Sequence, residues 1–312
     1  MMTSSESKVR RKIRRVGRKI AKMRAQRWVA RGENNFIRGE LEEALACCKK
    51  SLSIYDNLRR AYGLMAKVLM PGDDYVAVLS RFHDVLKPGS YVEIGVASGK
   101  TLALTKEGTK AVGIDPSPSI EEATQLHAKL FRITSDDFFE SYHLLEVLGT
   151  SRLALAFIDG LHHSEQVLKD FINLERYADK ETVILIHDCL PMSRLVTARS
   201  PSTTFWCGDV WKVIPCLMKY RPDLTIRIIP ARPSGLGMIT NLDPTSTVLM
   251  EKSNKIATEF QNQELDYDYL DLNRDRLSTI VPHLVPNDWQ HINEMLSSLL
   301  AKNEGRKREL KG

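Results

Sequence analysis

Short apolar runs alternate with longer segments of helical periodicity between residues 91 and 240. Runs that are apolar on both faces are typical of strands buried in a parallel sheet, and the intervening segments are long enough for crossover helices. The expected strands are 91–95, 111–115, 131–134, 153–159 and 182–187, the expected helices 100–106, 119–129, 136–148 and 164–178, and the expected closing hairpin 224–229 and 236–240. This pattern predicts an α/β fold with a Rossmann-like, doubly wound, mostly parallel sheet closed by a β-hairpin.

Polar residues follow each expected parallel strand. Ligands of open parallel sheets bind at the carboxyl ends of the strands, so these residues are the candidates for a site. In chain order they are Gly95, Asp115, Ser135 with Asp136, Asp159 with Gly160, and His187 with Asp188. Because the carboxyl ends of parallel strands meet at one edge of the sheet, we expect a single pocket there.

The turn between Gly95 and Gly99 allows a ligand to approach the backbone closely where a strand passes into the next segment. Asp115 lies 20 residues after Gly95, a spacing that suits a carboxylate accepting from two ribose hydroxyls. The turn reads G-x-x-x-G, whereas nicotinamide enzymes use G-x-G-x-x-G. The motif therefore predicts a nucleoside cofactor and disfavours a nicotinamide-dependent oxidoreductase.

Four segments together resemble the class I S-adenosylmethionine-dependent methyltransferases. They are 92–101, 113–115, 157–163 followed by Asp170, and 184–188. The pattern is most similar to the small-molecule O-methyltransferases of the catechol and caffeoyl type and their bacterial relatives, and it covers about residues 91–249. The resemblance implies a cofactor site made of Glu93, Gly95, Ser98, Gly99, Asp115, Ser135, Asp136 and Asp159. Asp115 would hold the ribose and Asp136 the adenine amino group.

Methyl transfer to a hydroxyl requires positioning of the acceptor and removal of its proton, by a base or with the help of a metal. Asp159 and Asp188 are the expected ligands of a divalent ion such as Mg²⁺. The metal-dependent subgroup carries a further acid or amide beside such residues, and here Gly160 and Cys189 stand there. The alternative base is a histidine, for which His162, His163 and His187 are candidates; we favour His163 or His187, oriented by Asp159 or Asp188.

Segment 203–212 contains two tryptophans, Trp206 and Trp211, that suit a flat apolar wall for the acceptor. The alternative is a helix that starts near Gly208 and buries Trp211 in the core. We expect the acceptor to be the hydroxyl of a small molecule or a glycan.

Helical patterns occupy both ends of the chain. The apolar residues Val9, Ile13, Val16, Ile20 and Met23 recur at spacings of three and four, which predicts an amphipathic helix. From residue 32 to 70 the small and aromatic residues fall as in a tetratricopeptide unit, with a degenerate second unit over 58–86. The alternative is a set of helices that pack on the next domain. Amphipathic segments at 248–260, 265–277 and 289–300 predict helices that cover the pocket or form a homodimer surface.

Charge is unevenly distributed over the 312 residues, whose net charge is +6. Residues 1–31 carry twelve Lys or Arg and one acid, Glu6, so this arm is +11 and the rest of the chain about −5. The arm suits an anionic membrane, RNA phosphates or the protein's own surface, or it is a solvated extension. The expected units are the arm 1–31, the helical segment 32–88, the methyltransferase domain 89–245 and the C-terminal extension 246–312.

The five cysteines show no C-x-x-C spacing, no apolar secretory signal precedes them, and no stretch approaches about 18 consecutive apolar residues. We therefore expect a reduced, cytoplasmic protein, with membrane contact only at its periphery. Beside the methyltransferase, two other functions stay open at this point. One is a non-catalytic binding or scaffold protein that uses the helical segment and the arm; the other is a nicotinamide-dependent oxidoreductase.

Overall fold

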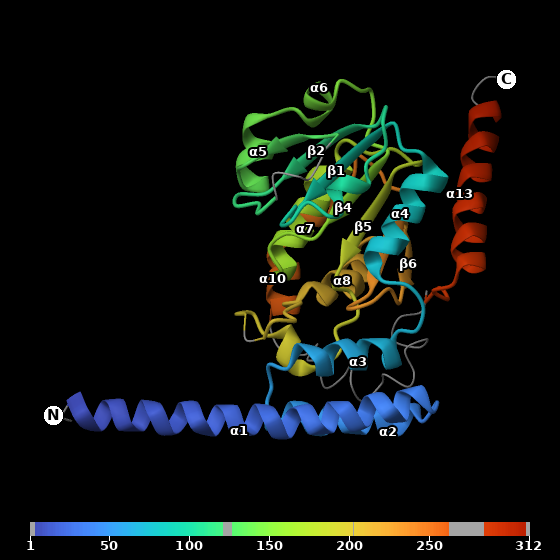
Figure 1. Ribbon diagram of the computed structural model, residues 1–312. Coiled ribbons are helices and arrows are strands. Elements are labelled where there is room, and N and C mark those ends of the chain that lie inside the picture. Colours follow the sequence, from blue (N-terminus) through green and yellow to red (C-terminus); the bar gives the residue numbers. More distant parts are fainter. Residues whose placement is uncertain (1–3, 121–126, 202, 262–283, 310–312) are drawn as a thin grey trace.

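The strands form one mixed sheet in a computed structural model that describes residues 4–120, 127–201, 203–261 and 284–309 (Figure 1). Within these residues the strands are β1 (Ser90–Ile94), β2 (Lys110–Ile114), β3 (Lys129–Phe131), β4 (Leu155–Ile158), β5 (Val183–His187), β6 (Thr225–Ile229) and β7 (Leu236–Thr240). Their order is β3-β2-β1-β4-β5-β7-β6. The first five strands are parallel, and β7 is antiparallel to both β5 and β6. This arrangement confirms the predicted Rossmann-like sheet with its closing hairpin.

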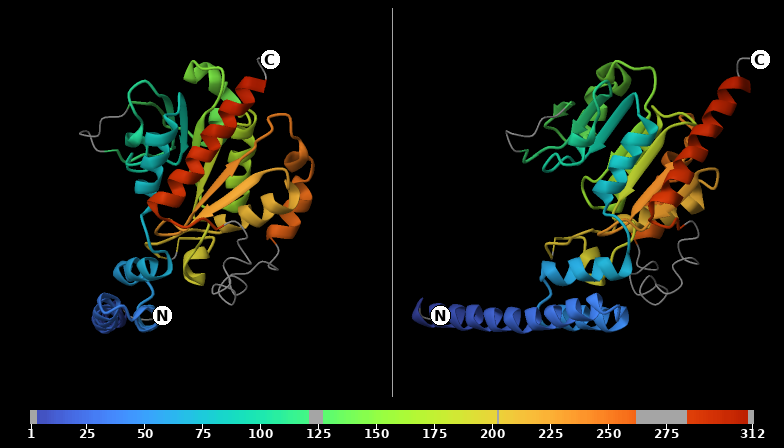
Figure 2. Two further views of the ribbon diagram at one scale, coloured as in Figure 1. Left: turned by 90° about the vertical axis from the view of Figure 1, so that its right-hand side faces the viewer. Right: turned by 45° about the vertical axis from the view of Figure 1, so that its right-hand side comes forward.

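Alternate residues of each buried strand lie on opposite faces of the sheet, and both faces are covered, which explains why the strands are mostly apolar. In β4, Leu155 and Phe157 face the cluster that includes α4 (Tyr75–Leu86) and α13 (Trp289–Glu309), whereas Ala156 and Ile158 face the other cluster. That second face packs against α7 (Ser164–Glu175) and α8 (Val213–Tyr220). The helices lie on both sides of the sheet in the rotated views (Figure 2). Both layers bury their apolar residues and leave the carboxyl ends of the strands for a site.

Two of the expected crossover helices differ in the structure. Segment 100–106 contains only a short 3-10 turn, Leu102–Leu104, because the backbone leaves the helical region at Thr105, with φ of −59° and ψ of 128°. Segment 136–148 is split into α5 (Ser135–Ser141) and α6 (Leu144–Leu148) by the extended backbone of Tyr142. Segment 119–129 lies partly outside the described residues.

The described C-terminal helices pack on the body of the domain. They are α9 (Val248–Glu251), α10 (Ser253–Gln261) and α13. The ring of Phe260 contacts that of Tyr220 on α8, and Ile292 and Leu296 of α13 are fully buried on the α4 side of the sheet. The helices expected at 248–260 and 289–300 are therefore present, and the one expected at 265–277 lies outside the described residues.

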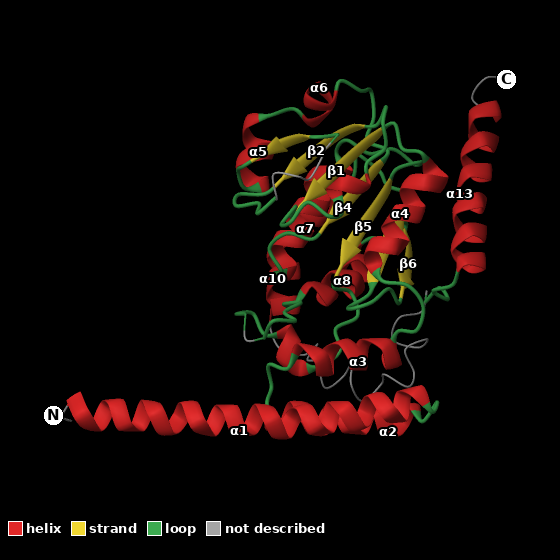
Figure 3. Ribbon diagram, in the orientation of Figure 1, coloured by secondary structure: helices red, strands yellow, loops and turns green. Residues whose placement is uncertain are grey.

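The N-terminal helices are α1 (Ser4–Ile37), α2 (Leu41–Ile54) and α3 (Arg59–Leu69). Gly32 allows α1 and α2 to approach closely, since a Cβ there would lie 3.0 Å from the Cβ of Cys47. The segment 58–86, expected as a second repeat, instead divides: α3 contacts α1 and α2, and α4 lies on the sheet. The expected boundary at residue 31 falls inside α1, whose first half extends beyond the rest of the molecule (Figure 3).

Candidate functional site

The glycine turn is held in place by Asp115, which follows β2. The Asp115 carboxylate accepts hydrogen bonds from the backbone N–H groups of Ala97 (2.8 Å) and Ser117 (2.7 Å). Gly95 has a φ of +89°, and a Cβ there would lie 2.1 Å from the Asp159 carbonyl oxygen. Only glycine fits between the two strand ends, so the turn can form only with this residue.

A cavity of about 630 Å³ opens over this turn, at the carboxyl ends of β1, β2 and β4. Five of the expected cofactor residues line it: Gly95, Asp115, Ser135, Asp136 and Asp159. Ser98 and Gly99 belong to the same turn but are not among the lining residues. The cavity is large enough for a nucleoside cofactor.

Glu93 differs from its expected place, because its side chain is turned into the core instead of the cavity. It is fully buried, and its carboxyl group accepts hydrogen bonds from the Tyr91 hydroxyl (2.6 Å) and the Thr101 hydroxyl (2.7 Å). Burial raises the pKa of Glu93 to about 8, although these hydrogen bonds oppose the shift. Glu93 therefore ties β1 to the segment after the glycine turn and acts on the cavity only through that segment.

Asp136 is oriented at the far end of the cavity by α7. Its carboxylate accepts from Lys169 Nζ (2.6 Å) and Gln166 Nε2 (3.0 Å). Burial opposes ionisation, but these two donors outweigh it and lower the pKa of Asp136. The Ser135 hydroxyl donates to Asp170 (2.6 Å), a buried acid whose pKa burial raises to about 6. The charged acceptor Asp136 thus lies beside a carboxyl group that takes up a proton more readily than an ordinary aspartate.

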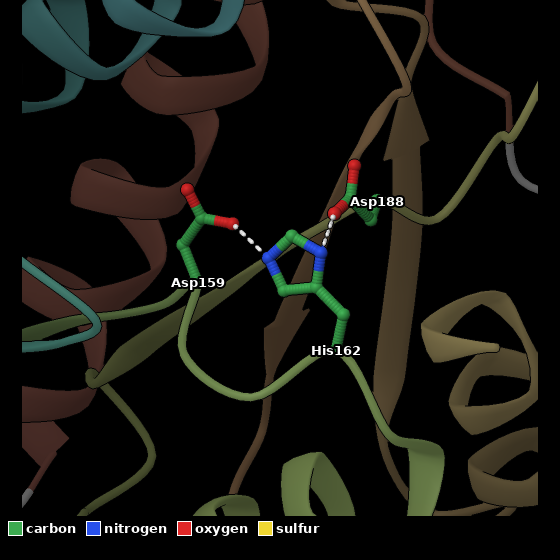
Figure 4. Close-up of side chains that lie close together, drawn as sticks. All are labelled: Asp159, His162 and Asp188. Carbon is green, nitrogen blue, oxygen red and sulfur yellow. Dashed lines mark ion pairs between the residues drawn. The ribbon is translucent and has the colours of Figure 1, made fainter. Parts of the chain in front are cut away.

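Asp159, His162 and Asp188 form a compact cluster at the ends of β4 and β5 (Figure 4). The imidazole of His162 lies between the two carboxylates, 3.5 Å from Asp159 through Nε2 and 3.2 Å from Asp188 through Nδ1. His187 Nδ1 lies 3.0 Å from the same Asp159 oxygen. The Ser234 hydroxyl donates to the other oxygen of Asp188, and Asp188 itself adopts a left-handed φ of +62°.

The charges of this cluster stabilise one another. Burial disfavours the His162 imidazolium, but Asp159 and Asp188 outweigh it and raise the pKa of His162 to about 9. Burial likewise disfavours ionisation of Asp159, yet His187 and His162 lower the pKa of Asp159 to about 2. The pKa of His187 is also raised, because the two aspartates outweigh burial. At neutral pH the cluster therefore holds paired charges, and His162 has no free site for a proton.

His163 lies outside the cluster, contrary to our expectation that it is a candidate base. His163 stands where the chain enters α7, and its Nε2 lies 2.9 Å from the carbonyl oxygen of Arg199. It lines neither the cavity over the glycine turn nor the second cavity, which adjoins it. The neighbouring His162 occupies the site instead. The loop between β4 and α7 has no regular period, so its sequence does not indicate which of the two side chains points inward.

A second cavity of about 530 Å³ adjoins the first and shares Asp159 and His162 with it. His187, Asp188 and Trp206 also line it. Trp206 stacks on His162 with ring centroids 5.0 Å apart, and both rings line this cavity. Trp211 is 5% exposed at the start of α8, so the alternative interpretation holds for that residue: it belongs to the core. The described C-terminal helices do not contribute to this cavity.

Comparison with known proteins supports a methyltransferase. Residues 92–189 match a family model described as a methyltransferase domain. This segment contains the end of β1 and all of β2 to β5, the glycine turn, Asp115 and the whole cluster of Asp159, His162 and Asp188. Together with the sheet order, the match makes this part of the chain a methyltransferase domain with the class I, Rossmann-like fold. Comparison with curated proteins gave no significant match.

Several solved structures are similar in fold. An O-methyltransferase from Bacillus cereus in complex with SAH is 13% identical, with 63% of this chain and 97% of that chain covered and a TM-score of 0.43. The O-methyltransferase TomG from Streptomyces achromogenes, in complex with SAM, is 13% identical, with 54% and 79% covered and a TM-score of 0.41. The SAH-bound methyltransferase PaMTH1 from Podospora anserina is 16% identical, with 65% and 88% covered and a TM-score of 0.40. At such scores these likenesses add no argument about the reaction.

Proposed function

We propose that this protein transfers the methyl group of S-adenosylmethionine to a hydroxyl of a small molecule or a glycan. The observation that carries the proposal is the junction of two cavities at Asp159 and His162. One cavity has the carboxylates that suit a nucleoside, and the other has the polar cluster. A methyl donor in the first and a hydroxyl in the second would meet at this junction, as an in-line displacement requires.

The roles of the cofactor residues follow from their hydrogen bonds. A carboxylate offers about four acceptor sites, and the Asp115 carboxylate uses two of them on backbone N–H groups. The remaining two suit the two ribose hydroxyls. Asp136 is fixed by Lys169 and Gln166, so it can accept from an adenine amino group without reorganisation. The glycine turn brings the backbone of Gly95 to the edge of the cavity.

Asp159 and Asp188 offer the carboxylate oxygens that a divalent ion such as Mg²⁺ prefers, and His162 would join them as a third ligand only after losing its proton. Their ligand atoms all lie within 4.8 Å of one another, and Asp188 Oδ2 is buried without a hydrogen bond. When bound, such an ion would lower the pKa of the acceptor hydroxyl and orient it. Ser234 and His187 would hold the two carboxylates in place, since each donates to one of them.

The experiment compares ligands by calorimetry. SAH should bind the protein and NAD should not, whereas a scaffold protein would bind neither and an oxidoreductase would bind NAD. A mass-spectrometric screen of hydroxylated metabolites incubated with SAM should then find a product heavier by one methyl group. A protein that binds SAH but methylates nothing would leave the scaffold function as the better description.

A second proposal concerns the exposed first half of α1, which we propose binds anionic membranes. Ile13, Val16, Ile20 and Met23 are 51–65% exposed on a helix otherwise rich in Lys and Arg. An apolar row of this kind suits insertion between lipid headgroups, whereas RNA phosphates would need only the charges. No helix in the described ranges is long and apolar enough to span a bilayer.

The test of this second proposal must respect the packing of α1. Ala25 and Val29 are fully buried, so only residues 1–20 should be deleted. The deletion should abolish sedimentation with phosphatidylserine vesicles and leave SAH affinity unchanged. Replacing Ile13, Val16 and Ile20 by serine keeps the charge and should also weaken vesicle binding. If this variant binds vesicles as tightly as the unmodified protein, or if RNA alone is bound, the membrane proposal is wrong.

A further inference from the structure

The second cavity is built partly by the N-terminal helical segment. Arg59, Gly63 and Ala66 of α3 line it opposite the strand ends. The remaining walls come from two loops: residues 204–207, with the rings of Phe205 and Trp206, and residues 232–234 between β6 and β7. The acceptor would therefore contact parts of the chain that are far apart in sequence.

The contact between α3 and the 204–207 loop is specific. Asn57 Oδ1 accepts from the Thr204 backbone N–H (2.8 Å) and from its hydroxyl (3.0 Å). The ring of Tyr62 stacks on that of Phe205, with centroids 5.6 Å apart. Tyr62 is fully buried, so these contacts hold α3 in a fixed position against the loop. Arg59, at the start of α3, is thereby held at the rim of the cavity.

Three cationic side chains line the cavity: Arg59, Lys100 and Arg232. Among the described residues none of the three has an ion pair or a side-chain hydrogen bond, and Arg232 Nε is buried without a partner. The backbone of Arg232 is fixed, because its carbonyl accepts from the Tyr75 N–H (2.8 Å). By contrast, the adjacent Arg60 is paired with Glu33.

The acids of the cavity do not neutralise these cations. Asp159 and Asp188 are paired with His162 and His187, as described above. The remaining acid, Asp74, caps α4 by accepting from the Ala77 N–H (2.9 Å). Among the described residues no acid therefore lies within ion-pair distance of Arg59, Lys100 or Arg232, so the three cations stay available to a ligand. Unpaired cations around a cavity favour a ligand that brings a negative group.

We infer that the acceptor is an acidic molecule, a hydroxylated compound whose carboxylate or phosphate binds Arg59, Lys100 and Arg232. This inference rests on the proposed function, because it takes the second cavity to be the acceptor site. The anionic group anchors the molecule, the ring of Trp206 supports its flat face, and its hydroxyl reaches the edge shared with the cofactor cavity. The N-terminal helical segment then has a definite role, which is to select the acceptor through Arg59.

The test uses matched pairs of probes on the full-length protein saturated with SAH. One pair is 3,4-dihydroxybenzoate and catechol, for a carboxylate; the other is glucose 6-phosphate and glucose, for a phosphate. In calorimetric titrations at low salt, we expect the acidic member of at least one pair to bind about tenfold more tightly than its neutral counterpart. The pair that shows the difference identifies which anion is preferred.

Arg59→Gln and Arg232→Gln should each remove most of this difference, whereas Arg60→Gln, one residue away and outside the cavity, should retain it. Equal affinity for both members of both pairs, including no binding of any probe, overturns the inference. So does an Arg59→Gln variant that folds, binds SAH and keeps the full preference for the acidic probe. SAH affinity is measured first in the same experiment: its absence contradicts the proposed function, and the titrations on the unliganded protein then test the anion site separately.

Discussion

Asp115→Asn is the substitution that tests the cofactor site most directly. The carboxylate accepts two backbone N–H groups of the glycine turn, which leaves about two acceptor sites for ribose hydroxyls. An asparagine loses the charge and replaces one oxygen by an NH2 group, so one of the two bonds to the turn is lost together with about one charge-assisted hydrogen bond to the ribose. Such a bond contributes about 1.5–3 kcal/mol. The dissociation constant for SAH should therefore rise by about 10-fold to 150-fold.

The assay for this variant is calorimetric titration with SAH, together with a thermal melt of the free protein. Asp137→Asn is the control, because Asp137 bonds to Thr134 at the start of α5 and lies outside the cavity. The control should bind SAH as the unmodified protein does. If Asp115→Asn melts normally and its SAH affinity is unchanged, Asp115 does not hold the cofactor, and the assignment of the 630 Å³ cavity is refuted.

Three further predictions concern the strand ends. Gly95→Ala would place its Cβ 2.1 Å from the Asp159 carbonyl oxygen, which should destabilise the fold by about 1–3 kcal/mol. Calorimetry should show this as a melting temperature lowered by several degrees, and an unchanged melting temperature would contradict the geometry. Treatment with EDTA should stop methyl transfer and Mg²⁺ should restore it, but not in Asp188→Asn; full activity in EDTA would show that no metal is needed. In EDTA, the free energy of unfolding should fall between pH 7 and 9 by at most about 1.4 kcal/mol per pH unit, because the raised pKa of His162 stabilises the fold only while its imidazolium persists. Urea titrations of His162→Gln should lack that part of the slope.

The fold could be predicted largely from the sequence, because a strand that is buried on both faces consists mostly of apolar residues. Strand β4 is apolar at every position and β5 at every position before His187, and each predicted strand was found within a few residues of its expected bounds. The helices were less predictable. Segment 100–106 forms only one 3-10 turn because Thr105 has a ψ of 128°, and the sequence does not show that dihedral angle.

The site was predictable where a strand fixes a residue and unpredictable where a loop does. Asp115 and Asp159 follow strands, so their place at the sheet edge follows from the strand ends. His162 and His163 are adjacent in a loop, and it is the contacts of His162 with Asp159 and Asp188, which are distant in sequence from each other, that distinguish them. Glu93 could have been assigned correctly, since alternation within β1 puts it on the same side as Tyr91, in the core.

The two cavities also differ in how far the family match covers them. Gly95, Asp115 and Asp159 lie inside the matched segment 92–189, whereas Arg59, Trp206 and Arg232 lie outside it. The hydrogen bond that holds one wall of the second cavity joins Asn57 to Thr204, which are 147 residues apart. The periodicity of the sequence is local, so it does not predict such a contact. A cofactor common to a whole class of enzymes requires the same strand ends in each member. The acceptor varies between members, so the residues that select it are expected in the added helices and loops, and on the proposed function they include Arg59 of α3 in this chain.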